Sequence, residues 1–170
     1  MNAHSYVEQA RLRKAAEADA IGIDDALISR LVETFYAHIR GHVVLGPMFA
    51  AKIVNWEPHL ARMKDFWASI SMESGRFRGN PMLKHVAISG IVPEHFEMWL
   101  RLWDETVSEV VANPDAQDLF RDRAHRIAAS LQTGVALHHG GLAALTKEKI
   151  DVDGIQHDGR RNPGGRITAA

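Results

Sequence analysis

Apolar residues recur at steps of three and four along most of the chain, the spacing of one buried face of an α-helix. The clearest run follows Asp24 and Asp25, either of which can cap the first turn of a helix. Three more runs lie within residues 55–75, 93–114 and 114–141, between residues that begin or end helices. Because no stretch alternates as a strand does, the pattern predicts an all-α protein with four long helices. The buried face of the first helix is predicted to consist of Leu27, Ile28, Leu31, Val32, Phe35, Tyr36 and Ile39.

Less regular stretches separate these runs. The pair Gly46-Pro47 predicts a short connection, and the segment from Gly79 predicts a bend followed by about one helical turn that carries His85. We predict that residues 1–20 form an N-terminal extension, either a weakly packed helix or a frayed end. Residues 21–141 form the globular domain in this interpretation. Residues 142–170, rich in charges and glycine, form a mobile C-terminal tail, and the fourth helix ends near Gly140-Gly141.

The composition excludes several kinds of cofactor site and binding partner. The chain has 170 residues, a formal net charge of −1 and no cysteine. Disulfides, thiolate metal sites and haem attached through cysteine are therefore excluded. The near-neutral charge offers no field for nucleic acid, and no apolar run is long enough to cross a membrane. We expect a cytoplasmic protein that binds neither nucleic acid nor membrane.

Taken singly, the candidate functional residues have ordinary explanations. Tyr36 and Trp99 lie on apolar helix faces, where aromatic residues usually form the core. His59 lies near the start of a helix, where a surface or capping role is common, and His85 alone is an ordinary histidine. No serine or threonine motif marks a nucleophile. Gly140-Gly141 ends a helix instead of beginning one, so no phosphate loop is predicted.

Together, these residues resemble a known pattern. A helix with tyrosine, a turn with phenylalanine, a helix with histidine, a Gly-x-Pro-x-x-x-His stretch and a helix with an inward tryptophan resemble the truncated haemoglobins, most closely group III. The resemblance spans roughly residues 24–140. Phe77 departs from it, because family members often carry tyrosine there. The matching stretches are Phe35-Tyr36, Leu45-Gly46-Pro47-Met48-Phe49, Trp56-Glu57-Pro58-His59, Asp65-Phe66-Trp67, Gly79-Asn80-Pro81-Met82-Leu83-Lys84-His85 and Phe96-Glu97-Met98-Trp99-Leu100.

The resemblance implies a truncated globin fold, a two-over-two helical sandwich around a non-covalent haem b. His85 then corresponds to the proximal iron ligand, and neutral imidazole is a suitable ligand for iron. The distal residues would be Tyr36, His59 and Trp99, each able to donate a hydrogen bond to a ligand with partial negative charge. Further contacts with the cofactor are expected from Phe49, Met63, Phe66, Trp67 and Leu83.

The function implied is reversible binding of dioxygen and other diatomic ligands such as nitric oxide. Redox detoxification of nitric oxide or peroxide is a second role, as a nitric oxide dioxygenase or a peroxidase-like oxidoreductase. Such turnover would need an external reductase, because the chain has no flavin or nicotinamide domain. We expect a monomer or weak dimer, with Lys84 and Arg76 as candidates to pair the haem propionates. The alternative is a haem-free helical interaction module, which would be colourless when purified.

Overall fold

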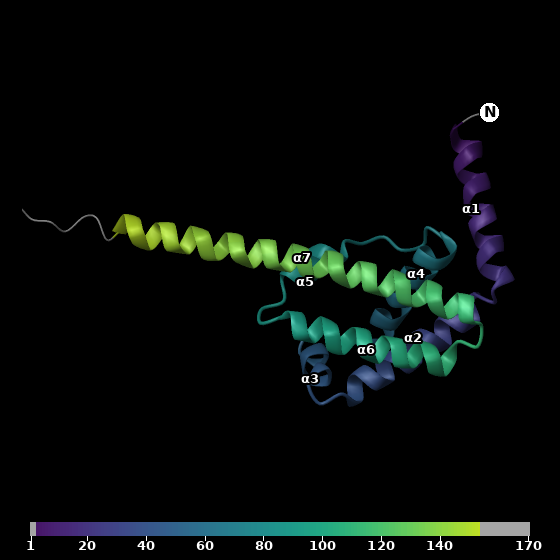
Figure 1. Ribbon diagram of the computed structural model, residues 1–170, viewed down its shortest axis with the longest axis horizontal. Helices are drawn as coiled ribbons and strands as arrows, with labels where there is room; N and C mark the ends of the chain where they lie inside the picture. The colour runs from purple at the N-terminus through teal and green to yellow at the C-terminus, as the bar shows by residue number, and fades with distance from the viewer. Residues whose placement is uncertain (1–2, 154–170) are drawn as a thin grey trace, which may run out of the picture.

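The computed structural model describes residues 3–153, which fold into seven α-helices without a strand (Figure 1). This confirms the predicted all-α class. The four long helices predicted from the sequence are all present, accompanied by an N-terminal helix and two helices of six residues. The helices are α1 (Ala3–Ala20), α2 (Asp25–Gly41), α3 (Leu45–Ala50), α4 (Trp56–Met72), α5 (Pro81–Val86), α6 (Pro93–Val110) and α7 (Pro114–Asp153).

Helix α2 forms as its sequence predicts. The Asp24 carboxylate accepts a hydrogen bond of 2.7 Å from the Leu27 amide, which satisfies one of the free donors of the first turn. All seven apolar residues predicted for its inner face are buried. Helix α2 therefore has neighbours along its whole apolar face, and it forms the centre of the fold.

The long helices form two crossed layers. Helix α2 packs against α4 in one layer, and α6 packs against α7 in the other. Figure 1 shows α6 and α7 side by side, and the contact between α2 and α6 joins the layers. This arrangement is the predicted two-over-two helical sandwich.

Stacked indoles fill the interface between the layers. The Trp103 ring is fully buried and lies nearly parallel to Trp67, with a centroid distance of 4.1 Å, and to Trp99, at 5.7 Å. Phe35 and Phe120 present their edges to Trp103, and the indole Nε1 of Trp103 donates a 3.3 Å hydrogen bond to the Phe120 carbonyl. The core thus joins α2, α4, α6 and α7 through aromatic contacts.

The connection predicted at Gly46-Pro47 is instead the short helix α3. Proline is tolerated because Pro47 lies in the first turn, where its missing N–H has no partner to lose. A Cβ at Gly46 would lie 2.8 Å from the Arg40 carbonyl oxygen, so glycine permits the close approach of α3 to the end of α2. The prediction of an irregular connection at Gly46-Pro47 was therefore wrong.

The fourth long helix also differs from the prediction. Helix α7 continues through Gly140-Gly141 to Asp153 instead of ending at the glycines. Each glycine costs only about 1 kcal/mol in a helix, and the strong helix formers of residues 142–145 follow directly. The predicted mobile tail lies partly on this helix, and residues 154–170 lie outside the described residues.

The N-terminal extension is the helix α1, which packs against α4 and buries Ala18. Its other described side chains are mostly exposed, including Tyr6 and Leu12, as expected of a segment without an apolar stripe. No helix in the described part of the chain combines the length and the hydropathy that a membrane span requires.

Candidate functional site

His85 lies in the last turn of α5, and the local sequence explains why this helix forms. The Asn80 side chain accepts a 3.2 Å hydrogen bond from the Leu83 amide, and Pro81 occupies the first helical position, where its fixed φ favours the helix. The chain returns to a turn after six residues. His85 is therefore carried by a short element with its own start signal.

The His85 ring is oriented by the backbone of its own helix. Its Nδ1 lies 2.7 Å from the Pro81 carbonyl oxygen. Since a carbonyl can only accept, Nδ1 carries the proton of this hydrogen bond, and in the neutral ring the lone pair then lies on Nε2. Histidines that bind metals usually hold their other N–H on a carbonyl or carboxylate in this way. His85 thus has the tautomer and the fixed ring that a metal ligand requires.

Helix α5 owes its position mainly to α7. None of its residues is fully buried, and Leu83 is 63% exposed. The Met82 side chain lies directly against Gly134 of α7, where an added Cβ would overlap its sulfur. Glycine inside a helix is unfavourable, so its presence there is consistent with this close packing. The segment that carries His85 therefore rests on a glycine of the longest helix.

Tyr36 and His59 form a second group of predicted site residues. Their rings lie 5.0 Å apart, edge to face, joining α2 to α4. Tyr36 is buried, and the Phe49 ring of α3 lies 6.1 Å from it. Three of the predicted site residues are thus brought together by three different helices.

The surroundings of this pair determine its protonation. Burial raises the pKa of Tyr36, so its hydroxyl stays protonated and available as a donor at neutral pH. Burial lowers the pKa of His59, and the nearby Arg62 cation lowers it further. The buried Nε2 of His59 has no hydrogen-bond partner among the described residues. An unpartnered buried nitrogen is costly and commonly indicates a ligand or water.

Helix α6 lies near both groups of predicted site residues. The ring centre of Phe35 lies 5.2 Å from that of Trp99 and 5.2 Å from that of Tyr36, both edge to face, so Phe35 packs between Trp99 and the Tyr36–His59 pair. One turn earlier on α6, the Phe96 ring lies 6.4 Å from His85. The predicted proximal and distal residues therefore border neighbouring turns of one helix.

The remaining predicted cofactor contacts lie on α4. Met63 and Phe66 are half-buried, whereas Trp67 is buried in the indole stack. Phe77, which departs from the family pattern, packs its ring edge to face with Phe66 at 5.0 Å. The apolar Phe77 thus has a packing partner, and the cofactor contacts of the α4 residues stay predictions.

Sequence reasoning assigned no role to Trp56, the first residue of α4. Its ring lies 6.1 Å from Tyr36 and 5.9 Å from His59. The Arg40 guanidinium also contacts Trp56 and lies over its ring, 5.0 Å from the ring centre. The spacing in the sequence could have indicated that Trp56 lies next to His59, since the two residues are almost one helical turn apart.

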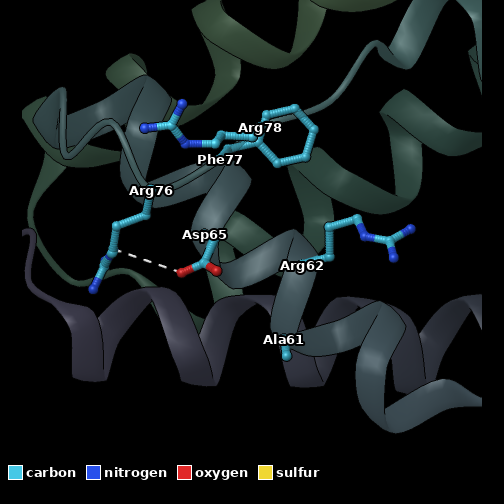
Figure 2. Close-up of a pocket in the computed structure, with 6 residues that line it drawn as sticks. All are labelled: Ala61, Arg62, Asp65, Arg76, Phe77 and Arg78. Atoms are coloured by element: carbon cyan, nitrogen blue, oxygen red, sulfur yellow. Dashed lines mark ion pairs between the residues drawn. The ribbon is translucent and has the colours of Figure 1, made fainter.

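A cationic cavity of about 280 Å³ lies beside this site, between α4 and the segment before α5. Figure 2 shows Arg76 turned towards Asp65, while Arg62 and Arg78 extend away from that carboxylate. Arg76 also pairs with Asp25, whose pKa is lowered chiefly by the hydrogen bond from Arg76. Arg62 and Arg78 form no ion pair within the described residues, 3–153.

Comparison with known proteins decides the family. A group 3 truncated hemoglobin of Campylobacter jejuni is 32% identical over 114 residues, which cover 65% of this chain and 89% of that protein. The chain belongs to the group 3 truncated haemoglobins. The crystal structure of a group III truncated hemoglobin from Campylobacter jejuni matches this truncated haemoglobin with a TM-score of 0.63 and 32% identity, covering 66% and 91% of the two chains. No family model matches the chain.

Membership of the truncated haemoglobins implies a haem cofactor, and the site residues fit one. A single histidine with a free Nε2 suits axial ligation of iron, and the described residues contain no cluster of three or more metal-ligating side chains that suggests another metal. The unpartnered Nε2 of His59 lies beside a tyrosine hydroxyl that stays neutral. One histidine nitrogen that can bind iron and a separate pair of polar side chains are therefore available in the described structure.

Proposed function

We propose that this globin binds haem b through His85 and binds dioxygen and other diatomic ligands beside Tyr36, His59 and Trp99. The observation that carries the proposal is the 2.7 Å hydrogen bond from His85 Nδ1 to the Pro81 carbonyl. It holds the ring through a backbone group of its own helix and leaves Nε2 as the nitrogen that can bind iron in the neutral ring. When bound, haem supplies the iron at which the diatomic ligand is held.

The distal residues would act through polarity and exclusion of water. Bound dioxygen carries partial negative charge, so donors directed at it form charge-assisted hydrogen bonds. Tyr36 stays protonated because it is buried, and neutral His59 carries one N–H. Trp99 can only donate. Three donors favour slow release of dioxygen, which suits chemistry on the ligand better than its delivery.

The cationic cavity would serve the haem propionates. A propionate is a carboxylate, and arginine binds carboxylates with two parallel hydrogen bonds. Arg76 is already paired with Asp25 and Asp65, so Arg62 and Arg78 are better candidates than Arg76, and Lys84 stays a candidate from the sequence. An arginine engaged with a propionate would also keep a positive charge close to His59.

Oxidation of nitric oxide is the reaction that we propose for this pocket. Nitric oxide, dioxygen and one electron together give nitrate, so each turnover requires one electron from outside the globin. The seven described helices form no flavin- or nicotinamide-binding domain. We therefore propose an external reductase as the partner of turnover.

Absorption spectroscopy tests the haem proposal. The purified protein should be red, with an intense Soret band, and the ferrous spectrum should report whether His59 also coordinates the iron. His85→Gly should lose most of its haem, and added imidazole should restore the band by occupying the vacated position. His95→Gly is a matched control, because His95 instead uses its Nδ1 to accept a hydrogen bond from the Val92 amide.

Two outcomes would contradict the proposal. A colourless protein that takes up no added haemin would favour the haem-free interaction module. A Soret band that is unchanged in His85→Gly would show that another residue holds the iron.

Mixing the oxygenated protein with nitric oxide and measuring the nitrate formed distinguishes turnover of nitric oxide from storage of dioxygen.

A further inference from the structure

Trp56 contacts both residues of the distal pair and is itself half-buried. Its ring contacts Tyr36 and His59, both edge to face, with interplanar angles of 61° and 89°. Tyr36 is buried and His59 is half-buried. Arg40, whose guanidinium lies over the Trp56 ring, is exposed. A ligand that approaches Tyr36 and His59 from the Arg40 side must therefore pass the indole.

The indole is held from outside by a cation. The Arg40 guanidinium lies 5.0 Å from the centre of the Trp56 ring, within the distance at which a cation is attracted to an aromatic face. Arg40 belongs to the last turn of α2, and Trp56 is the first residue of α4. The contact therefore joins the ends of two helices across the α3 connection. Helix ends open more readily than helix centres, so this is a contact that thermal motion can break.

We infer that Trp56 is a lid over the distal pocket, that Arg40 holds it closed, and that its displacement sets the rate of ligand entry. This inference rests on the proposed haem and distal pocket. The edge-to-face contacts also restrain the His59 ring, so displacement of Trp56 frees the distal histidine at the same time. Arg40 and Trp56 act here as positioning residues, since neither is placed against the ligand.

Carbon monoxide rebinding after laser photolysis of the ferrous holoprotein measures entry directly. Arg40→Met removes the cation and keeps an unbranched apolar side chain, and should speed association by about two- to fivefold. Trp56→Ala removes the ring and both aromatic contacts, and should speed association by at least about fivefold. Arg40→Lys should stay close to the parent, because it retains the cation. Arg30→Met removes another exposed arginine of α2 and serves as the matched control.

A second measurement needs no haem. In the apoprotein, the indole N–H of Trp56 gives one proton NMR signal, which Trp56→Phe identifies by its loss. Arg40→Met should shift that signal and increase its exchange with water, while Arg30→Met should not. If Trp56→Ala does not fold, Arg40→Met still provides both readouts.

The outcomes separate the lid from the haem proposal. A parent protein without a Soret band contradicts the proposed function, whatever Trp56 does. A haem-loaded protein whose association rate in Arg40→Met and in Trp56→Ala equals that of the parent overturns the lid. An unshifted indole signal in Arg40→Met overturns the role of Arg40.

Discussion

Replacing Tyr36 with phenylalanine removes one hydroxyl and leaves the ring in place. The ring should keep its packing, because its neighbours His59, Phe49 and Trp56 contact it through edge-to-face geometry and not through the hydroxyl. The hydroxyl is protonated at neutral pH, since burial raises the pKa of Tyr36. A hydrogen bond to a charged group contributes roughly 1.5–3 kcal/mol. Dioxygen should therefore leave the Tyr36→Phe variant about 10- to 150-fold faster than the parent.

Stopped-flow mixing measures this rate. The oxygenated protein is mixed with excess carbon monoxide, and the replacement of one ligand by the other follows the release of dioxygen. Carbon monoxide binding itself provides an internal comparison, because carbon monoxide carries little charge and gains less from a donor. Tyr6→Phe is the matched control, since Tyr6 is 68% exposed on α1.

Two results would refute this reasoning. An acceleration of less than about threefold would correspond to well under 1 kcal/mol and show that Tyr36 does not donate to the ligand. Equal acceleration of dioxygen and carbon monoxide release would show that the substitution had loosened the pocket as a whole. Either result would leave His59 and Trp99 as the remaining candidate donors.

Three further predictions concern the core, the distal histidine and the support of α5. Trp103→Ala should lower the free energy of unfolding by about 3–5 kcal/mol, whereas Tyr6→Ala should change it by less than about 0.5 kcal/mol in urea titrations. Burial lowers the pKa of His59 from 6.5, so the folded state binds fewer protons than the unfolded state and loses stability as the pH falls below 6.5. The His59→Leu variant should lose less stability than the parent when the free energy of unfolding is compared between about pH 7.5 and pH 5. Gly134→Val should displace Met82 and speed haem loss to apomyoglobin, and adding Met82→Ala should partly restore retention; unchanged haem loss would show that α5 does not depend on this contact.

The sequence predicted the elements whose apolar faces are fully covered. The inner face of α2 follows a strict helical spacing, so every residue predicted to be buried there is buried. Phe120 was not predicted, although it is fully buried on α7, and its spacing of four residues from Ala124 and eight from Ala128 could have indicated it. The end of α7 was predicted at Gly140-Gly141, because two glycines usually end a helix, and cooperativity carries the helix past them.

The candidate site was harder to predict from local sequence patterns than the helices were. His85 lies on six residues with no fully buried side chain, so no periodicity distinguishes it, and only the resemblance to a family indicated it. The Pro81 carbonyl that orients its ring is a backbone group, which a sequence cannot show to be free. The role of Trp56 depends on a contact with Arg40, sixteen residues earlier, across the α3 connection. Such contacts depend on how helix ends meet, which is set by the whole fold.

The parallel indoles of Trp67, Trp99 and Trp103 also have an optical consequence. Transitions of stacked aromatic rings couple to one another, and the coupling depends on the distance and angle between the rings. Three of the four tryptophans of the chain share this stack, so the near-ultraviolet circular dichroism should be dominated by the core. The band would collapse when the helix layers separate, even in protein without cofactor. The molecule therefore carries its own reporter of core packing, independent of the colour expected from its haem.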